Sequence, residues 1–247
     1  MVNTIAIIPA RSGSKSVPNK NVASLDGFPL IAYSIAVAKL SKKIERVIVS
    51  TNSEKYAEIA IQYGAEVPFI RPENISTDLS VDRDFLLHAM QWLEKHENQK
   101  PEYWVHLRPT TPLRSTLLID NAIDIIQHSS DATSLRSGHK APESPLKWFK
   151  MNNKGFFDSI MLEKGNELFN LPREYFDDVY IPDGYVDIVK RSFVTSIDSI
   201  HGDKILGFES PEDTNEVDSI SEFDYIKYQM TQKESPLFDY LNQHSSK

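Results

Sequence analysis

The chain has 247 residues, of which 40% are hydrophobic and none is cysteine, and its formal net charge at pH 7 is -8. This length predicts one domain over residues 1–247 that carries at most a small insertion, and the missing cysteines exclude disulfides, thiolate catalysis and cysteine-ligated metal sites. The acidic balance argues against a nucleic-acid partner, and the lack of a signal peptide or a long apolar run predicts a cytoplasmic protein with no membrane partner.

A small basic loop follows the first predicted strand. An apolar, β-branched run over residues 5–8 leads into Arg11, Gly13, Lys15 and Lys20. Gly13 and the neighbouring serines allow backbone N–H groups to approach a phosphate closely, and Arg11 can bind two oxygens at once. The spacing is neither that of a Walker P-loop nor that of a dinucleotide-binding loop. The alternative to an anion site is a solvated basic turn.

Strand and helix patterns alternate through the first half of the chain. Strands are predicted at residues 44–50, 66–70, 103–107 and 133–137, and helices at 28–40, 54–63, 81–96 and 117–128. This alternation predicts a three-layer, Rossmann-like α/β fold with a mixed, mainly parallel sheet. In such sheets ligands bind beyond the carboxyl ends of the strands, where the basic loop also falls.

Residues from about 138 to 182 have no sustained period. We interpret this segment as an inserted arm, because a structureless loop of this length is uncommon inside a compact enzyme. Its aromatic residues are Trp148, Phe149, Phe156, Phe157 and Phe169. They favour a homodimer with arm exchange, because a second copy would cover them. The chain then returns through strands at 184–189 and 204–208 and a helix at 221–232, and we expect a frayed tail over residues 243–247.

The basic loop resembles the signature of the acylneuraminate cytidylyltransferases, the CMP-sialic acid synthetase-like branch of the sugar cytidylyltransferases. The resemblance rests first on residues 9–15 and 18–21 and extends to about residue 230, with its motifs in order. It implies a nucleotide-diphospho-sugar transferase-like fold, Mg²⁺ as cofactor, and transfer of CMP from CTP to the anomeric hydroxyl of a 2-keto-3-deoxy acid sugar. The loop residues that it assigns to CTP are Ala10, Arg11, Ser14, Lys15, Lys20 and Asn21.

A second group of residues matches the positions that hold the base. The resemblance places Arg71 beside cytosine and Ser80 and Asp82 among the neighbouring contacts. The family more often has a small or hydroxyl residue at the position of Asp82. A carboxylate only accepts hydrogen bonds, so it would suit the amine of cytosine and reject the carbonyl of uracil. The alternative is a turn and a helix cap.

A third group is expected to bind the acceptor sugar. Residues 107–114 resemble the family segment Leu-Gln-Pro-Thr-Ser-Pro-Leu-Arg, with Arg108 in place of Gln. An arginine there could bind a carboxylate with two hydrogen bonds, although a surface ion pair is the alternative. By the same resemblance the other sugar contacts are Thr110, Asp183 and Tyr185, together with Lys147 and Arg173 from the arm of a neighbouring subunit.

The expected metal site is incomplete. The resemblance puts Asp218 on the first carboxylate of an Asp-x-Asp pair, but Ile220 stands at the second. Because Mg²⁺ takes one or two carboxylates plus phosphate oxygens and water, Asp187 is the candidate for the second ligand. The alternative for Asp218 is a helix N-terminal charge. The residues expected to be catalytic are Arg11 and Lys20, which would hold the triphosphate, and Asp218.

Two other functions stay open. One is a nucleotidyltransferase that acts on a sugar 1-phosphate with another nucleoside triphosphate. The other is a non-catalytic nucleotide-binding homologue, which Ile220 suggests because it removes the second carboxylate. The identity of the acid sugar is also open.

Overall fold

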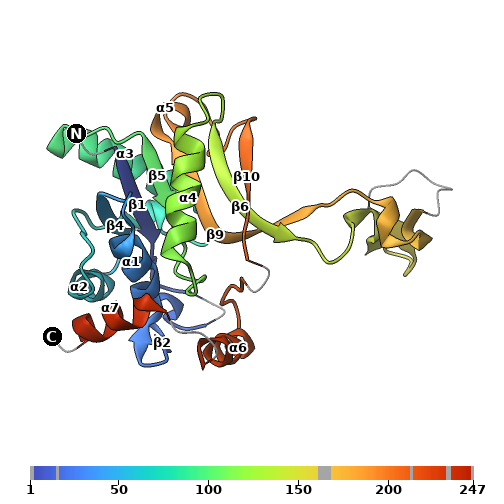
Figure 1. Ribbon diagram of the computed structural model, residues 1–247, viewed down its shortest axis with the longest axis horizontal. Coiled ribbons are helices and arrows are strands. Elements are labelled where there is room, and N and C mark those ends of the chain that lie inside the picture. The colour runs from blue at the N-terminus through green and yellow to red at the C-terminus, as the bar shows by residue number, and fades with distance from the viewer. Residues whose placement is uncertain (1–2, 15–16, 161–167, 212–213, 232–234, 246–247) are drawn as a thin grey trace.

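A six-stranded sheet forms the centre of the protein, with the strand order β10-β6-β9-β5-β1-β4 (Figure 1). The computed structural model describes residues 3–14, 17–160, 168–211, 214–231 and 235–245. The strands are β1 (Thr4–Pro9), β4 (Arg46–Ser50), β5 (Tyr103–His106), β6 (Ser134–Lys140), β9 (Tyr180–Lys190) and β10 (Ile205–Glu209). β1 is parallel to β4 and β5, and β6 is parallel to β10, whereas β9 runs antiparallel to both β5 and β6. The predicted mixed, mainly parallel sheet is confirmed.

Helices cover both faces of this sheet. One core contains residues of α1 (Leu30–Leu40), α2 (Glu54–Gln62), α4 (Thr116–Gln127), α6 (Ile220–Thr231) and α7 (Pro236–Ser245). The other contains residues of α3 (Asp82–Glu97) and the short α5 (Arg191–Val194). The helix α1 is buried from Leu30 to Ala38, which its almost entirely apolar sequence allows. The three-layer arrangement is therefore confirmed.

Two sequence predictions need correction. The strand predicted at 66–70 is reduced to a single bridge between Glu66 and Ile48, because Pro68 has no backbone N–H to donate to a neighbouring strand. The tail predicted to fray from residue 243 is helical as far as Ser245, the end of α7. Leu237 and Leu241, one helical turn apart, anchor α7 in the core.

A long arm extends from the body of the protein between β6 and β9 (Figure 1). Near its end lies a small hairpin of β7 (Phe149–Met151) and β8 (Phe157–Ser159), which pair antiparallel. A second hairpin, β2 (Ser24–Leu25) with β3 (Phe28–Pro29), lies in the body just before α1. The aromatic rings of the arm hairpin are well exposed, as at Phe157 (66%) and Phe149 (39%). Within the described part of the chain, no helix is long and apolar enough to cross a bilayer.

Candidate functional site

A cleft of about 440 Å³ lies beyond the carboxyl ends of the parallel strands β1 and β5. Four segments far apart in the sequence form it: the basic loop, the region after α2, the start of α3 and the loop after β5. Its lining includes nine of the residues predicted from the sequence: Arg11, Ser14, Lys20, Asn21, Arg71, Ser80, Asp82, Arg108 and Thr110. The topology explains this gathering, since the ends of neighbouring parallel strands meet at one edge of a sheet.

Backbone and side-chain contacts fix the shape of the basic loop. Asn21 is buried and donates from Nδ2 to the carbonyl oxygen of Arg11 at 2.9 Å, which ties the two ends of the loop together. Gly13 has φ 81°, a left-handed conformation that favours glycine. Ala10 is buried and donates its N–H to the carbonyl of Ser50 at 2.9 Å, so it ties the start of the loop to the end of β4. Lys15 lies outside the described residues.

Each of the two cleft cations from this loop lies beside a carboxylate. Arg11 Nη2 is 2.8 Å from Asp78 Oδ1, and Asp78 itself lines the cleft. Lys20 Nζ is 2.8 Å from Asp218 Oδ1, with the lysine side chain only 12% exposed and the aspartate 64% exposed. Asp218 therefore reaches the edge of the cleft through Lys20. These pairs hold both cations in defined positions where they can meet an anionic ligand.

Arg71 forms the rear wall of the cleft. Its Nε donates to Ser50 Oγ at 2.9 Å, and its guanidinium carbon lies 4.9 Å from the centre of the Phe85 ring. Burial lowers the pKa of Arg71 to about 10. The cation is thus fixed by both hydrogen bonding and an aromatic face, and it offers a flat, rigid surface to a ligand.

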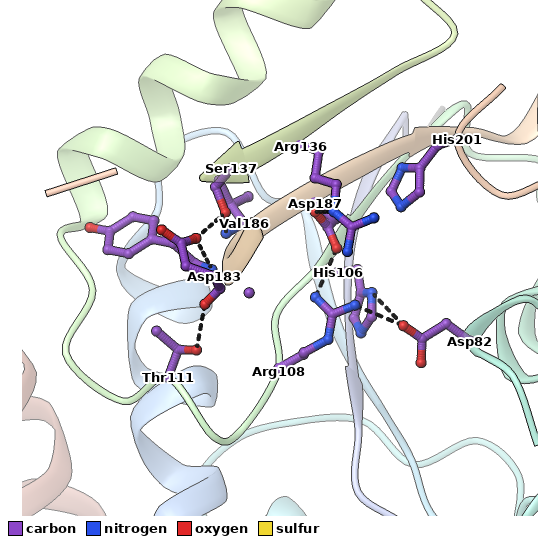
Figure 2. Close-up of polar contacts among 12 residues, drawn as sticks. Asp82, His106, Arg108, Thr111, Arg136, Ser137, Asp183, Val186, Asp187 and His201 are labelled. Atoms are coloured by element: carbon purple, nitrogen blue, oxygen red, sulfur yellow. Dashed lines mark hydrogen bonds and ion pairs between the residues drawn. The ribbon is translucent and has the colours of Figure 1, made fainter. Parts of the chain in front are cut away.

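Four charged side chains form a continuous row from the cleft into the protein, as Figure 2 shows. Arg108 donates from Nη2 to Asp82 Oδ2 and from Nη1 to Asp187 Oδ2, both at 2.8 Å. The other oxygen of Asp187 lies 3.6 Å from Arg136 Nε. Asp187 is 1% exposed, whereas Asp82 at the cleft end is 43% exposed. Burial lowers the pKa of Arg108, but Asp187 and Asp82 more than offset this effect and raise the pKa overall.

Two buried histidines lie next to this row (Figure 2). His106 on β5 is directly opposite Asp187 on β9. Burial holds the pKa of His106 well below its ordinary value, and the charge of Arg108 lowers it further. Burial also lowers the pKa of His201. Both rings are therefore held neutral at physiological pH, and neither one competes with Arg108 or Arg136 for the Asp187 carboxylate.

Two predicted sugar contacts are placed inside the protein. Asp183 is 4% exposed; its carboxylate accepts hydrogen bonds from Ser137 Oγ at 2.7 Å, from the N–H of Tyr185 at 3.0 Å and from Ser210 Oγ. Tyr185 is 1% exposed, and its hydroxyl accepts a hydrogen bond from the N–H of Ser115 at 2.7 Å. These contacts fix the start of β9 behind the cleft. Both side chains therefore have a structural role, and neither lines the cleft, so their contact with a sugar stays a prediction.

The expected pairing of Asp187 with Asp218 as metal ligands has no support in this geometry. The paired strands hold Asp187 between Arg108 and Arg136, so positive charge already faces both of its oxygens. The acidic neighbour of Asp218 is instead Glu216, which sequence reasoning missed although an acidic pair at i and i+2 was visible. Burial, and next the negative charge of Asp218, raise the pKa of Glu216. Among the residues described, no group of three or more His, Cys, Asp or Glu is arranged to hold a metal ion.

Gly184 and Arg114 bring these segments together. A Cβ on Gly184, which has φ 63°, would collide with Glu216 Oε1 and lie 3.2 Å from Arg108 Cδ. Arg114 is 3% exposed and donates to the carbonyls of Gly184 and Arg108 at 2.9 and 2.8 Å. The N–H of Val217 donates to the carbonyl of Thr110 at 2.7 Å. The acidic segment is therefore held against the loop that follows β5.

The two predicted arm residues lie away from the cleft. Lys147 Nζ is 5.9 Å from the centre of the Phe176 ring. Arg173 donates from Nη2 to the carbonyl of Ala141 at 3.4 Å and lines a separate hollow on the arm. Neither residue contributes to the lining of the cleft in its own chain.

The comparisons with known proteins agree with this geometry. A family model described as "Cytidylyltransferase" matches residues 5–153. The N-acylneuraminate cytidylyltransferase of Escherichia coli O18:K1:H7 is 42% identical over 123 residues, which are 50% of this chain and 28% of that protein. The match thus covers less than a third of the length of the Escherichia coli protein. The pseudaminic acid cytidylyltransferase of Campylobacter jejuni is 28% identical over 215 residues, 81% of this chain and 92% of that protein.

A solved structure shares the fold over almost the whole chain. It is that of a CMP:2-keto-3-deoxy-manno-octonic acid synthetase complexed with CTP. The TM-score is 0.67 at 15% sequence identity, and the match covers 93% of this chain and 99% of the other.

Proposed function

This chain belongs to the cytidylyltransferase family, and from this premise we propose that it transfers CMP from CTP to the anomeric hydroxyl of a 2-keto-3-deoxy acid sugar. The single observation that carries the proposal is the cleft, where Arg11 and Lys20 of the basic loop and Arg71 of the region after α2 line one space. The names of the related enzymes, which act on acylneuraminate and pseudaminic acid, support an acid sugar as the acceptor. The enzyme would act in the cytoplasm, as the sequence predicts.

The basic loop would hold the triphosphate. The cations Arg11 and Lys20 line the cleft, and Ser14 and Asn21 line it beside them. Such fixed donors stabilise the charge that develops on the departing pyrophosphate without having to reorganise during the reaction. Lys15 would add to this charge.

The rear of the cleft would hold cytidine. Arg71 and Phe85 form a rigid polar and aromatic wall, and Ser80 and Asp82 line the cleft nearby. Asp82 Oδ2 accepts a hydrogen bond from Arg108, which leaves Oδ1 to accept one from an amine. A carboxylate at this position would favour the N4 amine of cytosine over the O4 carbonyl of uracil.

The reaction exchanges one phosphorus–oxygen bond for another. The anomeric hydroxyl oxygen attacks the α-phosphorus, and the bond from that phosphorus to the bridging oxygen of pyrophosphate breaks. The proton of the hydroxyl passes to solvent, and Lys20 lies where it would balance the charge of the phosphates. Thr110 and the loop after β5 would orient the acceptor, because they line the cleft next to Arg108.

The acidic segment before α6 fits a magnesium ion. Burial, and next the negative charge of Asp218, raise the pKa of Glu216, and a bound divalent cation would offset both effects. Asp218 and Glu216 would thus hold Mg²⁺ together with phosphate oxygens, in place of the pair expected from the sequence. When bound, the ion supplies Lewis-acid stabilisation of phosphate charge.

The arm would pack on a second copy of the chain. Its exposed rings support this proposal, since Phe149 and Phe157 stack on each other at 5.6 Å and still have large exposed fractions. In such a homodimer Lys147 and Arg173 of one copy would lie close to the cleft of the other copy. There they would contact the acceptor sugar.

Pyrophosphate release tests the proposal. The purified protein is assayed with CTP and Mg²⁺ and with N-acetylneuraminate, legionaminate, pseudaminate and 3-deoxy-manno-octulosonate in turn; UTP, GTP and ATP serve as controls. We expect release with CTP and one of these acids. Release that requires a sugar 1-phosphate or a different nucleotide would contradict the proposal, as would CTP binding without any turnover.

A further inference from the structure

Another hollow, separate from the cleft, lies over β6, β9 and β10. Its volume is about 360 Å³, within the range of small-molecule sites. Arg136 on β6 and Gly207 on β10 line it and are paired in register, as are Arg136 and Asp187. Since residues paired in this way have their side chains on one face of a sheet, the hollow shares its face with Asp187. The ion pair from Asp187 to Arg108 then connects it to the cleft.

The polar groups of the hollow suit a ligand that is rich in oxygen atoms. Among the described residues, the ion pair of the Arg136 side chain is the 3.6 Å contact from Nε to Asp187, and the side chain is 37% exposed. Its two terminal nitrogens are therefore available as donors. Nearby, Glu209 accepts a hydrogen bond from the hydroxyl of Tyr180 at 3.4 Å, and both residues line the hollow. At Gly207, which lines the hollow, an added Cβ would meet no heavy atom within 4 Å, so the space over this residue is open.

The order of the strands fixes the distance between the hollow and the phosphates. The basic loop follows β1, and β5 and β9 lie between β1 and β6. With neighbouring strands about 4.8 Å apart, Arg136 on β6 lies roughly 15 Å from the strand that carries the basic loop. The reacting hydroxyl must lie at the α-phosphate, close to that loop. Only the opposite end of an acceptor could extend into the hollow.

We propose that this hollow binds the end of the acceptor sugar remote from its reacting hydroxyl, and that Arg136 donates hydrogen bonds to hydroxyl or acyl oxygens there. The proposal rests on the proposed function and deepens it. It makes Arg136 a specificity-determining residue that favours acid sugars with a long, oxygen-bearing tail. The row of ion pairs supplies the physical link, because Asp187 is paired with Arg108 at the cleft and with Arg136 at the hollow.

Steady-state kinetics test the proposal. The acid sugar that the wild-type enzyme accepts best among the four named above is assayed with saturating CTP and Mg²⁺. We expect Arg136→Gln to raise the KM for the sugar roughly 10-fold or more, the scale of a lost charge-assisted hydrogen bond, and Arg136→Lys to recover part of the loss. The KM for CTP should stay within about twofold, since Arg136 does not line the cleft. Lys204→Gln is the matched control, because Lys204 lines a different hollow beside β10.

A second variant probes the space without disturbing Asp187. Gly207→Val places a β-branched side chain, which suits a strand, into the open space over this lining residue. The KM for the sugar should again rise while the KM for CTP and the unfolding temperature stay close to wild type. An active enzyme whose sugar KM is unchanged in both Arg136→Gln and Gly207→Val would overturn this inference alone. A wild-type enzyme inactive with every acid sugar would overturn the proposed function and the inference with it.

Discussion

Arg108 Nη1 lies 2.8 Å from Asp187 Oδ2, an ion pair in which the carboxylate is 1% exposed. The family segment that residues 107–114 resemble has Gln at the position of Arg108. A buried carboxylate requires a hydrogen-bonded cation, and the arginine satisfies this requirement from the cleft side. Arg108 is therefore held by the protein's own carboxylates and is not free to bind the carboxylate of a sugar with both terminal nitrogens.

Arg108→Gln should destabilise the protein. The substitution removes the cation closest to the buried Asp187 carboxylate and leaves only the longer contact to Arg136. We therefore expect the free energy of unfolding to fall by about 3 kcal/mol. The double variant Arg108→Gln with Asp187→Asn should recover most of this loss, because it removes the uncompensated charge. Urea unfolding measures both. Asp82→Asn is the control: it removes the exposed partner of the same arginine, so its effect should stay below about 1 kcal/mol. Equal losses in Asp82→Asn and Arg108→Gln would contradict this account.

Asp218→Ala should lower turnover roughly 10²-fold or more, the scale of removing a key electrostatic group. The reason is twofold, because Asp218 is the proposed metal ligand and also positions Lys20 at 2.8 Å. Pyrophosphate release measured against Mg²⁺ concentration would reveal the loss and a weaker response to the ion. Asp224→Ala, at an exposed position of α6, is the matched control and should behave as wild type. Near-normal activity of Asp218→Ala would show that the metal is placed wrongly.

The sequence predicted the elements that have a strong local signal. The helix α1 and the strands β1 and β4 are found where the apolar pattern put them, and Arg11 and Lys20 of the basic loop line a cleft. The row from Asp82 to Arg136 could not be predicted in the same way. It depends on β9 lying antiparallel between β5 and β6, an order that local pattern does not encode.

The candidate metal ligands could not be predicted for the same reason, since they also depend on how distant strands pair. The hypothesis that Asp187 and Asp218 bind one metal ion required the ends of their two chain segments to be adjacent. In the structure, the register of β9 pairs Asp187 with Arg136 on β6. Glu216 was visible in the sequence as the second residue before Asp218. Its place at the site follows from two features of the folded chain: the Glu216 side chain lies against Gly184, and the pKa of Glu216 is raised.

The double variant Phe149→Asp with Phe157→Asp should weaken self-association. These two exposed rings lie on the arm hairpin, and charge there opposes burial against a second copy. Sedimentation velocity over a range of concentrations measures the effect, and we expect a shift toward monomer with little change in the unfolding temperature of the body. Ile61→Asp, at an exposed apolar position of α2, is the control for surface charge and should leave association unchanged. A wild-type chain that is monomeric at every concentration would refute the proposed dimer.

Acidification from pH 7.5 to 5.5 should lower the stability of the protein through its buried and half-buried histidines. Burial depresses the native pKa of His106, His201 and His88 below the ordinary value of 6.5. Below about pH 6.5 the unfolded chain therefore binds protons that the native state does not, so the free energy of unfolding falls as the pH falls. The slope approaches about 1.4 kcal/mol per pH unit for each histidine that stays neutral in the native state.

His106→Leu isolates the largest of these contributions. Both ring nitrogens of His106 are buried and have no hydrogen-bond partner among the described residues, so an apolar side chain removes the titration without breaking a native hydrogen bond. Urea unfolding of the variant and wild type at half-unit pH steps gives the two slopes. We expect the variant to lose less stability than wild type on going from pH 6.5 to 5.5, with a difference that grows as the pH falls. Parallel pH profiles would mean that His106 accepts a proton in the native state. The conclusion that its ring stays neutral beside Asp187 would then be wrong.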